Sequence, residues 1–169
     1  MQTLSSSLVK ITACIALALG LLTVRLTAQT DSPHAAAVKT AIAEMIAEAT
    51  KLGEPKLDGT ALLFGPTKIN GNYVLVDALK AKYKCTSTFF AKKGEGFVRI
   101  STNVIKDDGS RAVGTPLDPK GPAMAAIQKN EPYYGVAEIL GKKYQTGYEP
   151  VRNTANEIIG IYYVGFLLE

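Results

Sequence analysis

Three stretches rich in tyrosine, β-branched and other apolar residues fill the last third of the chain and constrain its fold most. They run over residues 136–140, 144–151 and 158–166. Polar breaks at residues 141–143 and 152–157 separate them, and breaks of this kind are typical of reversals between antiparallel strands. The block from Arg111 to Gly165 contains neither cysteine nor histidine. It therefore predicts an antiparallel sheet and favours binding over bond-making chemistry.

The first 28 residues have the order of a secretory signal peptide. Lys10 supplies a positive start, residues 11–24 form an unbroken apolar run, and Ala28 ends the segment with a small residue, as cleavage requires. Arg25 ends the run before the roughly 20 apolar residues that a membrane-spanning helix needs. We expect residues 1–28 to be removed and residues 29–169 to form one periplasmic or secreted ligand-binding domain. The alternative is a domain anchored in the membrane by residues 11–24.

The charge pattern does not favour nucleic acid as a partner. The whole chain carries a formal net charge of +4, and Lys10 and Arg25 lie in the segment that we expect to be cleaved. The remaining lysines are scattered, as in residues 80–84, 92–93 and 142–143. They lack the aromatic-interleaved basic stripe of a strand-binding protein, so we expect them to be solvated.

Residue types needed for catalysis or for a metal centre are scarce. His34 is the single histidine, and Cys85 is the single cysteine after residue 28. A histidine-based triad or a three-ligand zinc site needs more imidazoles or thiols. We therefore expect no enzymatic activity and no metal or redox cofactor. Cys85 lies in a β-prone run, where a lone cysteine is more often a small buried hydrophobe than a nucleophile.

Two helices are predicted in the first half of the mature chain. Ser32 and Pro33 open the first helix, Gly53 stops it, and its apolar residues recur at helical spacing: Val38, Ile42, Met45, Ile46, Ala49 and Leu52. A strand is predicted over residues 60–64. The second helix is predicted over residues 73–83, with Asn72 as its cap.

From Cys85 onward the pattern becomes strand-like. β-prone runs cover residues 85–91, 97–105 and 111–115, and the Gly-containing loops at residues 92–96 and 106–110 are typical of hairpins. A short helix is predicted over residues 121–130, with Pro122 at its first position. Strands flanked by helices and joined by hairpins predict an α+β domain built on an antiparallel sheet.

Arg99 is the first candidate for a binding site. Strand alternation places Phe97, Arg99 and Ser101 on one face. A guanidinium at this position lies either on a solvent-exposed face or in a pocket. In a pocket, the planar guanidinium would suit a carboxylate, because it can donate two parallel hydrogen bonds.

Tyrosines supply the second set of candidates. Tyr144, Thr146 and Tyr148 alternate along one predicted strand, and Tyr133 and Tyr134 precede its neighbour. Clustered tyrosine hydroxyls over an apolar floor suit recognition of a small polar molecule. They are also compatible with half-buried sheet residues whose tips reach water.

Residues 69–80, 97–104, 108–123, 134–150 and 158–165 resemble the Cache 3/Cache 2 fusion group of single-Cache sensor domains, the extracytoplasmic parts of bacterial chemoreceptors and sensor kinases. The resemblance implies a PAS-like fold, with a long N-terminal helix packed along a central antiparallel sheet and a ligand pocket on the other side. It implies sensing of a small organic molecule, often a short carboxylate, for signal transduction or chemotaxis. Carried onto this chain, the pocket residues would be Arg99, Ser101, Arg111, Tyr133, Tyr144 and Tyr148.

In such receptors the final strand continues into a membrane helix and an output module, whereas this sequence stops at Glu169. We therefore expect binding to be reported through a partner such as a membrane sensor or kinase. The alternative is a structural or protein-interaction module of the same fold without a functional ligand pocket.

Overall fold

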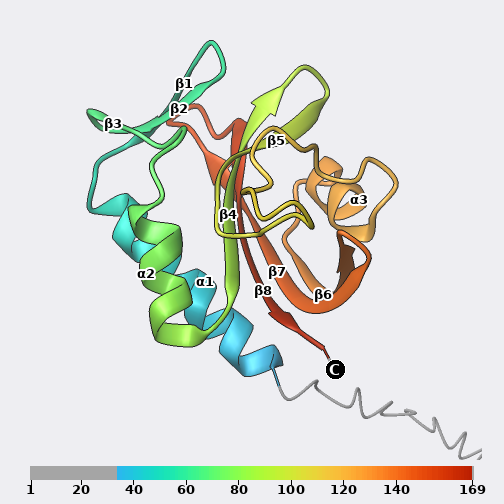
Figure 1. Cartoon of the computed structure of the whole chain (residues 1–169). Coiled ribbons are helices and arrows are strands. Elements are labelled where there is room, and N and C mark those ends of the chain that lie inside the picture. Colours follow the sequence, from blue (N-terminus) through green and yellow to red (C-terminus); the bar gives the residue numbers. More distant parts are fainter. Residues whose placement is uncertain (1–33, 169) are drawn as a thin grey trace, which may run out of the picture. The chain divides into compact units, whose positions relative to one another are not determined.

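A five-stranded antiparallel sheet of strand order β5-β4-β8-β7-β6 lies at the centre of the fold (Figure 1). The computed structural model describes residues 34–168. The strands of this sheet are β4 (Thr86–Lys93), β5 (Gly96–Thr102), β6 (Tyr133–Ile139), β7 (Lys142–Arg152) and β8 (Ile158–Leu167). The last three strands and their reversals lie where the tyrosine-rich runs predicted them. The predicted signal peptide and the predicted helix start at Ser32 and Pro33 lie outside the described residues.

Two helices, α1 (Ala35–Thr50) and α2 (Val74–Tyr83), cover one face of the sheet (Figure 1). The buried residues of α1 are Val38, Ala41, Ile42, Met45 and Ala49. All but Ala41 belong to the helical stripe expected from the sequence, whereas the remaining two residues of that stripe, Ile46 and Leu52, are only partly buried. Gly147 of β7 lets α1 approach closely, because a Cβ there would lie 2.7 Å from Val38 Cγ1. The predicted α+β arrangement, with the N-terminal helix packed on an antiparallel sheet, is confirmed.

A second, three-stranded sheet lies beside the main one and consists of β1 (Pro55–Asp58), β2 (Ala61–Phe64) and β3 (Thr67–Lys68). Only β2 was expected from the sequence. β1 has only four residues, of which Pro, Lys and Asp are uncommon in strands, and β3 has only two, so neither gives a clear strand signal. The Asn70 side chain links the segment after β3 to the start of β2. Its Oδ1 accepts from Leu62 N and its Nδ2 donates to Thr60 O, both at 2.9 Å.

The opposite face of the main sheet is covered by α3 (Pro122–Gln128) and by the loop that precedes it (Figure 1). The strand predicted over residues 111–115 is wrong: this segment makes only isolated bridges, Ile105 with Arg111 and Val98 with Pro116. Gly114 adopts a left-handed φ of +83°, which turns the chain. Its N–H donates to Arg99 O at 2.8 Å, so the loop runs along the outer edge of β5.

The two faces of the sheet carry two separate hydrophobic cores. Adjacent residues divide between them: Phe89 and Tyr162 point toward α1 and α2, whereas Phe90 and Tyr163 point toward α3. We call the second group the cavity-side core; it comprises Phe90, Phe97, Val104, Ala112, Leu117, Ala123, Met124, Ile127, Ile139, Tyr148, Ile161 and Tyr163.

Candidate ligand-binding cavity

A cavity of about 470 Å³ opens beside the cavity-side core. The middle of β5, the loop before α3, the start of α3 and the β6–β7 hairpin surround it. Its lining residues are Arg99, Thr115, Pro116, Leu117, Asp118, Lys120, Gly121, Pro122, Ala123, Val136, Ala137, Glu138, Ile139, Leu140 and Tyr148. Mostly apolar walls with a few polar groups are typical of a small-molecule site.

Arg99 supplies the one charged side chain that is buried in this lining, with 5% of its surface exposed. Its Nη1 donates to Thr115 Oγ1 at 2.7 Å and to Pro116 O at 3.4 Å, and its Cζ lies 5.0 Å from the centre of the Phe90 ring. Its Nε is buried without a hydrogen-bond partner. Burial lowers the pKa of the guanidinium, because desolvation disfavours the charged form.

No carboxylate of residues 34–168 forms an ion pair with Arg99. The four ion pairs within this range join Lys51, Lys82, Lys106 and Arg111 to their acidic partners. Arg99 is therefore a buried cation whose charge is balanced only by neutral hydrogen-bond acceptors and by the face of Phe90.

Tyr148 of β7 lines the same cavity and is 1% exposed. Its ring packs among aromatic neighbours, with centroids 4.9 Å from Tyr163 and 6.1 Å from Tyr133. Burial raises the pKa of its hydroxyl, while the nearby Arg99 opposes that rise. Because the hydroxyl is held neutral and forms no hydrogen bond within the described residues, it is available to a ligand.

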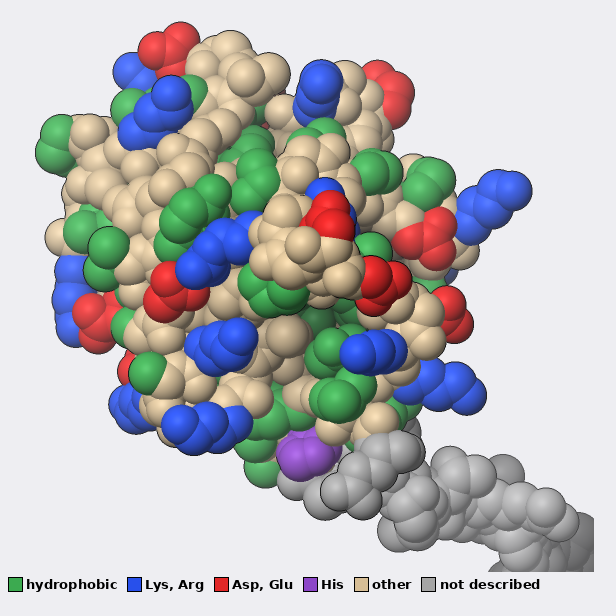
Figure 2. Space-filling model, in the orientation of Figure 1, with side chains coloured by type: hydrophobic (Ala, Val, Ile, Leu, Met, Phe, Trp, Pro, Cys, Tyr) green, Lys and Arg blue, Asp and Glu red, His purple; other side chains and the backbone are tan. Residues whose placement is uncertain are grey.

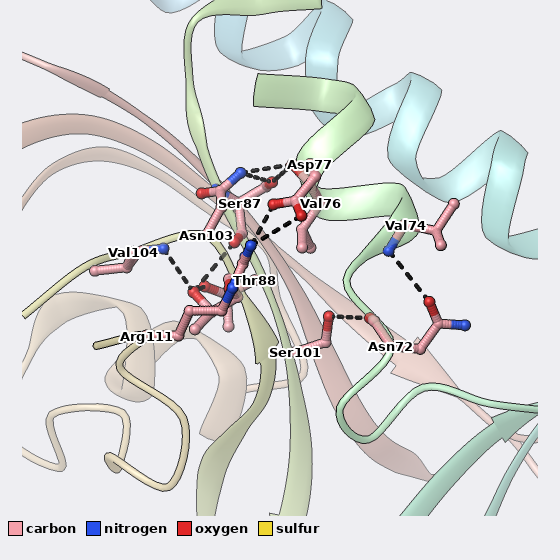
Figure 3. Close-up of polar contacts among 11 residues, drawn as sticks. Asn72, Val74, Val76, Asp77, Ser87, Thr88, Ser101, Asn103, Val104 and Arg111 are labelled. Atoms are coloured by element: carbon pink, nitrogen blue, oxygen red, sulfur yellow. Dashed lines mark hydrogen bonds and ion pairs between the residues drawn. The ribbon is translucent and has the colours of Figure 1, made fainter. Parts of the chain in front are cut away.

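Ser101 does not share the face of Arg99, contrary to the expectation from strand alternation. Phe89 pairs with Ser101 and Phe90 with Arg99, which leaves Ile100 as an extra residue in β5. Such a bulge resets the alternation of a strand. Ser101 consequently points to the α1–α2 face, where its Oγ donates to Asn72 O at 2.6 Å (Figure 3).

Arg111 also lies outside the cavity lining. Its Nη1 and Nη2 each donate at 2.9 Å to one carboxylate oxygen of Asp77 (Figure 3). Nη1 also donates to Thr102 O at 2.8 Å, and the guanidinium lies 4.2 Å from the centre of the Tyr73 ring. The Arg111 guanidinium, which we expected to bind a ligand, is thus already paired with Asp77 of α2.

A buried polar network continues from this ion pair into the sheet (Figure 3). The Asn103 side chain donates to Val76 O and to Ser87 Oγ, and its Oδ1 accepts from Ser87 N at 2.8 Å. Thr88 and Thr102 share a hydroxyl hydrogen bond of 2.6 Å. These contacts bind α2 to the β4–β5 pair and hold in place the start of the loop before α3 (residues 103–121), which we call the cavity loop.

The other two candidate tyrosines stand beside the cavity and not in its lining. Tyr133 packs on Tyr148, and its hydroxyl donates to Val136 O at 2.8 Å. Tyr144 is half-buried against the cavity-side core. The structure therefore brings Arg99 and Tyr148 together in one cavity and places Ser101, Arg111, Tyr133 and Tyr144 elsewhere.

The sequence reasoning missed the residues of the cavity loop and of the β6–β7 turn, including Asp118, Glu138 and Leu140. Asp118 opens a turn, since its Oδ1 accepts from Lys120 N at 2.9 Å. The Asp-Pro-Lys-Gly run predicts that turn but does not say which part of the sheet it covers.

A helix-backed antiparallel sheet with a cavity on its other face is an architecture that suits the binding of a small molecule. The chain belongs to the Cache 3/Cache 2 fusion domain family, which matches residues 26–169. Cache domains are extracytoplasmic, typically act as sensory modules that bind small ligands, and are generally non-catalytic. A search among curated proteins found no match. Within residues 34–168, no helix is long and apolar enough to cross a membrane.

Proposed function

We propose that this chain is a sensory Cache domain that binds a short carboxylate in the Arg99 cavity and reports it through a partner. The ligand carboxylate would pair with Arg99 and accept a hydrogen bond from the Tyr148 hydroxyl. Its apolar part would lie against the walls that Leu117, Ala123 and Ile139 supply.

The observation that carries this proposal is the buried guanidinium without a counter-ion. Removing an ion from water costs several kcal/mol even after relaxation of the protein. The bonds to Thr115 and Pro116 and the contact with Phe90 offset only part of that cost. A bound carboxylate would offset it further, because charge-assisted hydrogen bonds are about twice as strong as neutral ones.

The other assignments follow from the family and from the composition. We infer a periplasmic or secreted domain of residues 29–169, released from a signal peptide of residues 1–28, with a membrane sensor or kinase as its partner. Positive and negative side chains are interspersed over the face shown in Figure 2, a mixture that suits a solvated domain better than a nucleic-acid surface. We also infer binding without catalysis and without a cofactor.

The ligand test combines a thermal-shift screen of short carboxylates with calorimetric titration of the best one. A ligand at 100 times its Kd stabilises the fold by about 2.7 kcal/mol. Arg99→Ala should weaken binding by roughly 2 to 5 kcal/mol, and Arg99→Lys should restore only part of it, because an ammonium lacks the two-pronged geometry.

Arg152→Ala is the matched control, since Arg152 bonds to Asn130 and lies outside the cavity lining. Unchanged affinity in Arg99→Ala, with the fold intact by circular dichroism, would move the site elsewhere. Failure of every short carboxylate to shift the unfolding temperature would favour the alternative, a structural or interaction module of the same fold.

Export is tested separately by N-terminal sequencing of the native protein. A mature chain that begins at Gln29 supports cleavage after Ala28. Recovery of the intact N-terminus from washed membranes would instead assign residues 11–24 as an anchor.

A further inference from the structure

The mouth of the cavity carries charge opposite to that of its floor. Arg99 lies at the buried floor, whereas Asp118 and Glu138 are exposed lining residues at the opening. Neither acid forms an ion pair within residues 34–168. Lys120 is the only basic residue of the described lining besides Arg99. The opening therefore has two unpaired carboxylates against one ammonium.

Asp118 is held in place at this opening before any ligand arrives. Its Oδ1 accepts from Lys120 N at 2.9 Å, and its backbone carbonyl accepts from Gly121 N at 3.2 Å. Gly121 leaves room for the carboxylate, because a Cβ there would lie 3.2 Å from Asp118 Oδ2. Leu117 N, one residue earlier, donates to Phe97 O at 2.9 Å and fixes the loop to β5.

The negative charge of Asp118 is felt at Tyr148, near the buried end of the cavity. Burial is the main cause of the raised pKa of Tyr148, and the negative charge of Asp118 adds to it. Tyr148 lies close enough to Arg99 for their charges to interact, and both line the cavity. One molecule that spans the cavity would thus meet a cation at one end and a carboxylate at the other.

The volume agrees with a ligand that has two polar ends. At about 470 Å³, the cavity lies within the range usual for small-molecule sites and is large for a two-carbon acid. A simple fatty acid would leave Asp118 and Glu138 facing an uncharged tail, and a dicarboxylate would place like charges together at the opening.

We propose that the ligand is a zwitterion, an amino acid or a related amino-carboxylate. Its carboxylate pairs with Arg99, and its ammonium is held by Asp118 with support from Glu138. This inference rests on the proposed function, because it takes Arg99 as the carboxylate anchor. The second anchor is the new element, and it selects among carboxylates by their other end.

The test uses four acids that share four carbons: butyrate, 2-aminobutyrate, 4-aminobutyrate and succinate. Calorimetric titration of the full chain should show at least one amino acid binding about tenfold or more tightly than butyrate. Asp118→Asn should abolish that preference while leaving the affinity for butyrate within about threefold. The variant keeps the Oδ1 acceptor for Lys120 N, so the loop is retained.

Asp58→Asn serves as the matched control, because Asp58 is an exposed carboxylate of β1 outside the cavity lining. It should leave all four affinities unchanged. Equal binding of butyrate and both amino acids, lost in Arg99→Ala, would overturn the zwitterion and leave the carboxylate site standing. Tightest binding of succinate would also overturn it and would assign Lys120 as the second anchor. Absence of binding by all four acids would overturn the zwitterion, and failure of the whole carboxylate screen would overturn the Arg99 site as well.

Discussion

Arg111 forms a bidentate ion pair with Asp77, in which each of two guanidinium nitrogens lies 2.9 Å from one carboxylate oxygen. The pair joins the cavity loop to the first turn of α2. The same guanidinium covers the Tyr73 ring and bonds to Thr102 O. The Arg111 side chain thus makes three different contacts within the protein. These contacts give it a structural role, whereas the sequence had suggested that it binds a ligand.

The first prediction is that Arg111→Lys lowers stability. Lysine keeps the charge but loses the paired fork and the flat contact with Tyr73. The side chains of the pair are 31% and 45% exposed, so solvent screens the attraction and we expect a loss of about 1 to 2 kcal/mol. Urea denaturation measures it. We expect Asp77→Asn to cost the same free energy of unfolding. A double variant whose loss equals the sum of the two single losses would show that the two residues act independently.

Much of the sheet was predictable because local pattern and tertiary environment agree there. The runs that became β7 and β8 alternate or are continuously apolar, and the Gly141 and residue 152–157 breaks have the chemistry of turns. The helical stripe of α1 was equally clear, since its buried residues face one core.

The failures have local physical causes. Residues 111–115 look β-prone, but the left-handed Gly114 and the missing N–H of Pro116 prevent a regular ladder. The bulge at Ile100 moved Ser101 to the other face, and a one-residue insertion in a strand has no signature in hydrophobic periodicity. Arg99 and Tyr148 could be named as candidates because they are polar residues within predicted strands. The place of Asp118 in the cavity lining could not be predicted, because it depends on how a loop folds over the sheet.

The second prediction concerns the stability cost of the buried charge. Arg99→Met keeps much of the side-chain volume and removes a desolvated cation whose Nε has no partner. Replacing buried charges by apolar groups is often neutral or stabilising, so the ligand-free protein should gain up to about 1 kcal/mol. Thermal unfolding without ligand measures it. A loss of more than about 2 kcal/mol would show that Arg99 is mainly structural.

The third prediction tests the close approach of α1 to β7 at Gly147. Its Cβ in Gly147→Ala would lie 2.7 Å from Val38 Cγ1 and 2.9 Å from the Tyr134 ring. Overpacking of this kind costs about 1 to 3 kcal/mol. Val38→Ala should cost stability alone but rescue part of the loss when combined with Gly147→Ala, since adjacent sites couple. Strictly additive losses in the double variant would contradict the contact.

The fourth prediction is a pH dependence from Asp108. The hydrogen bonds from the Ser110 hydroxyl and N–H, with Lys106 nearby, lower the pKa of Asp108 from 3.8 to about 2. A folded-state pKa below the unfolded one stabilises the fold above pH 3.8, and this contribution is lost as the pH falls toward about 2. Asp108→Asn should flatten the stability curve in that window. An unchanged slope would assign the acid sensitivity to other carboxylates.

The last prediction concerns Leu140, which stands at the tip of the β6–β7 hairpin with a left-handed φ of +49°. The Ile139–Lys142 pair and the φ of +78° at Gly141 match a two-residue turn that favours Asn-Gly, because both central residues need positive φ. A leucine in this conformation costs roughly 1 kcal/mol, and its side chain lines the mouth of the cavity. Leu140→Asn should therefore raise stability by about 0.5 to 1 kcal/mol while weakening the best carboxylate ligand, since the mouth loses an apolar wall. Denaturation and calorimetric titration of the same variant separate the two effects. Increased stability with unchanged affinity would show that Leu140 does not contact the ligand, and decreased stability would show that packing of the leucine outweighs its backbone strain.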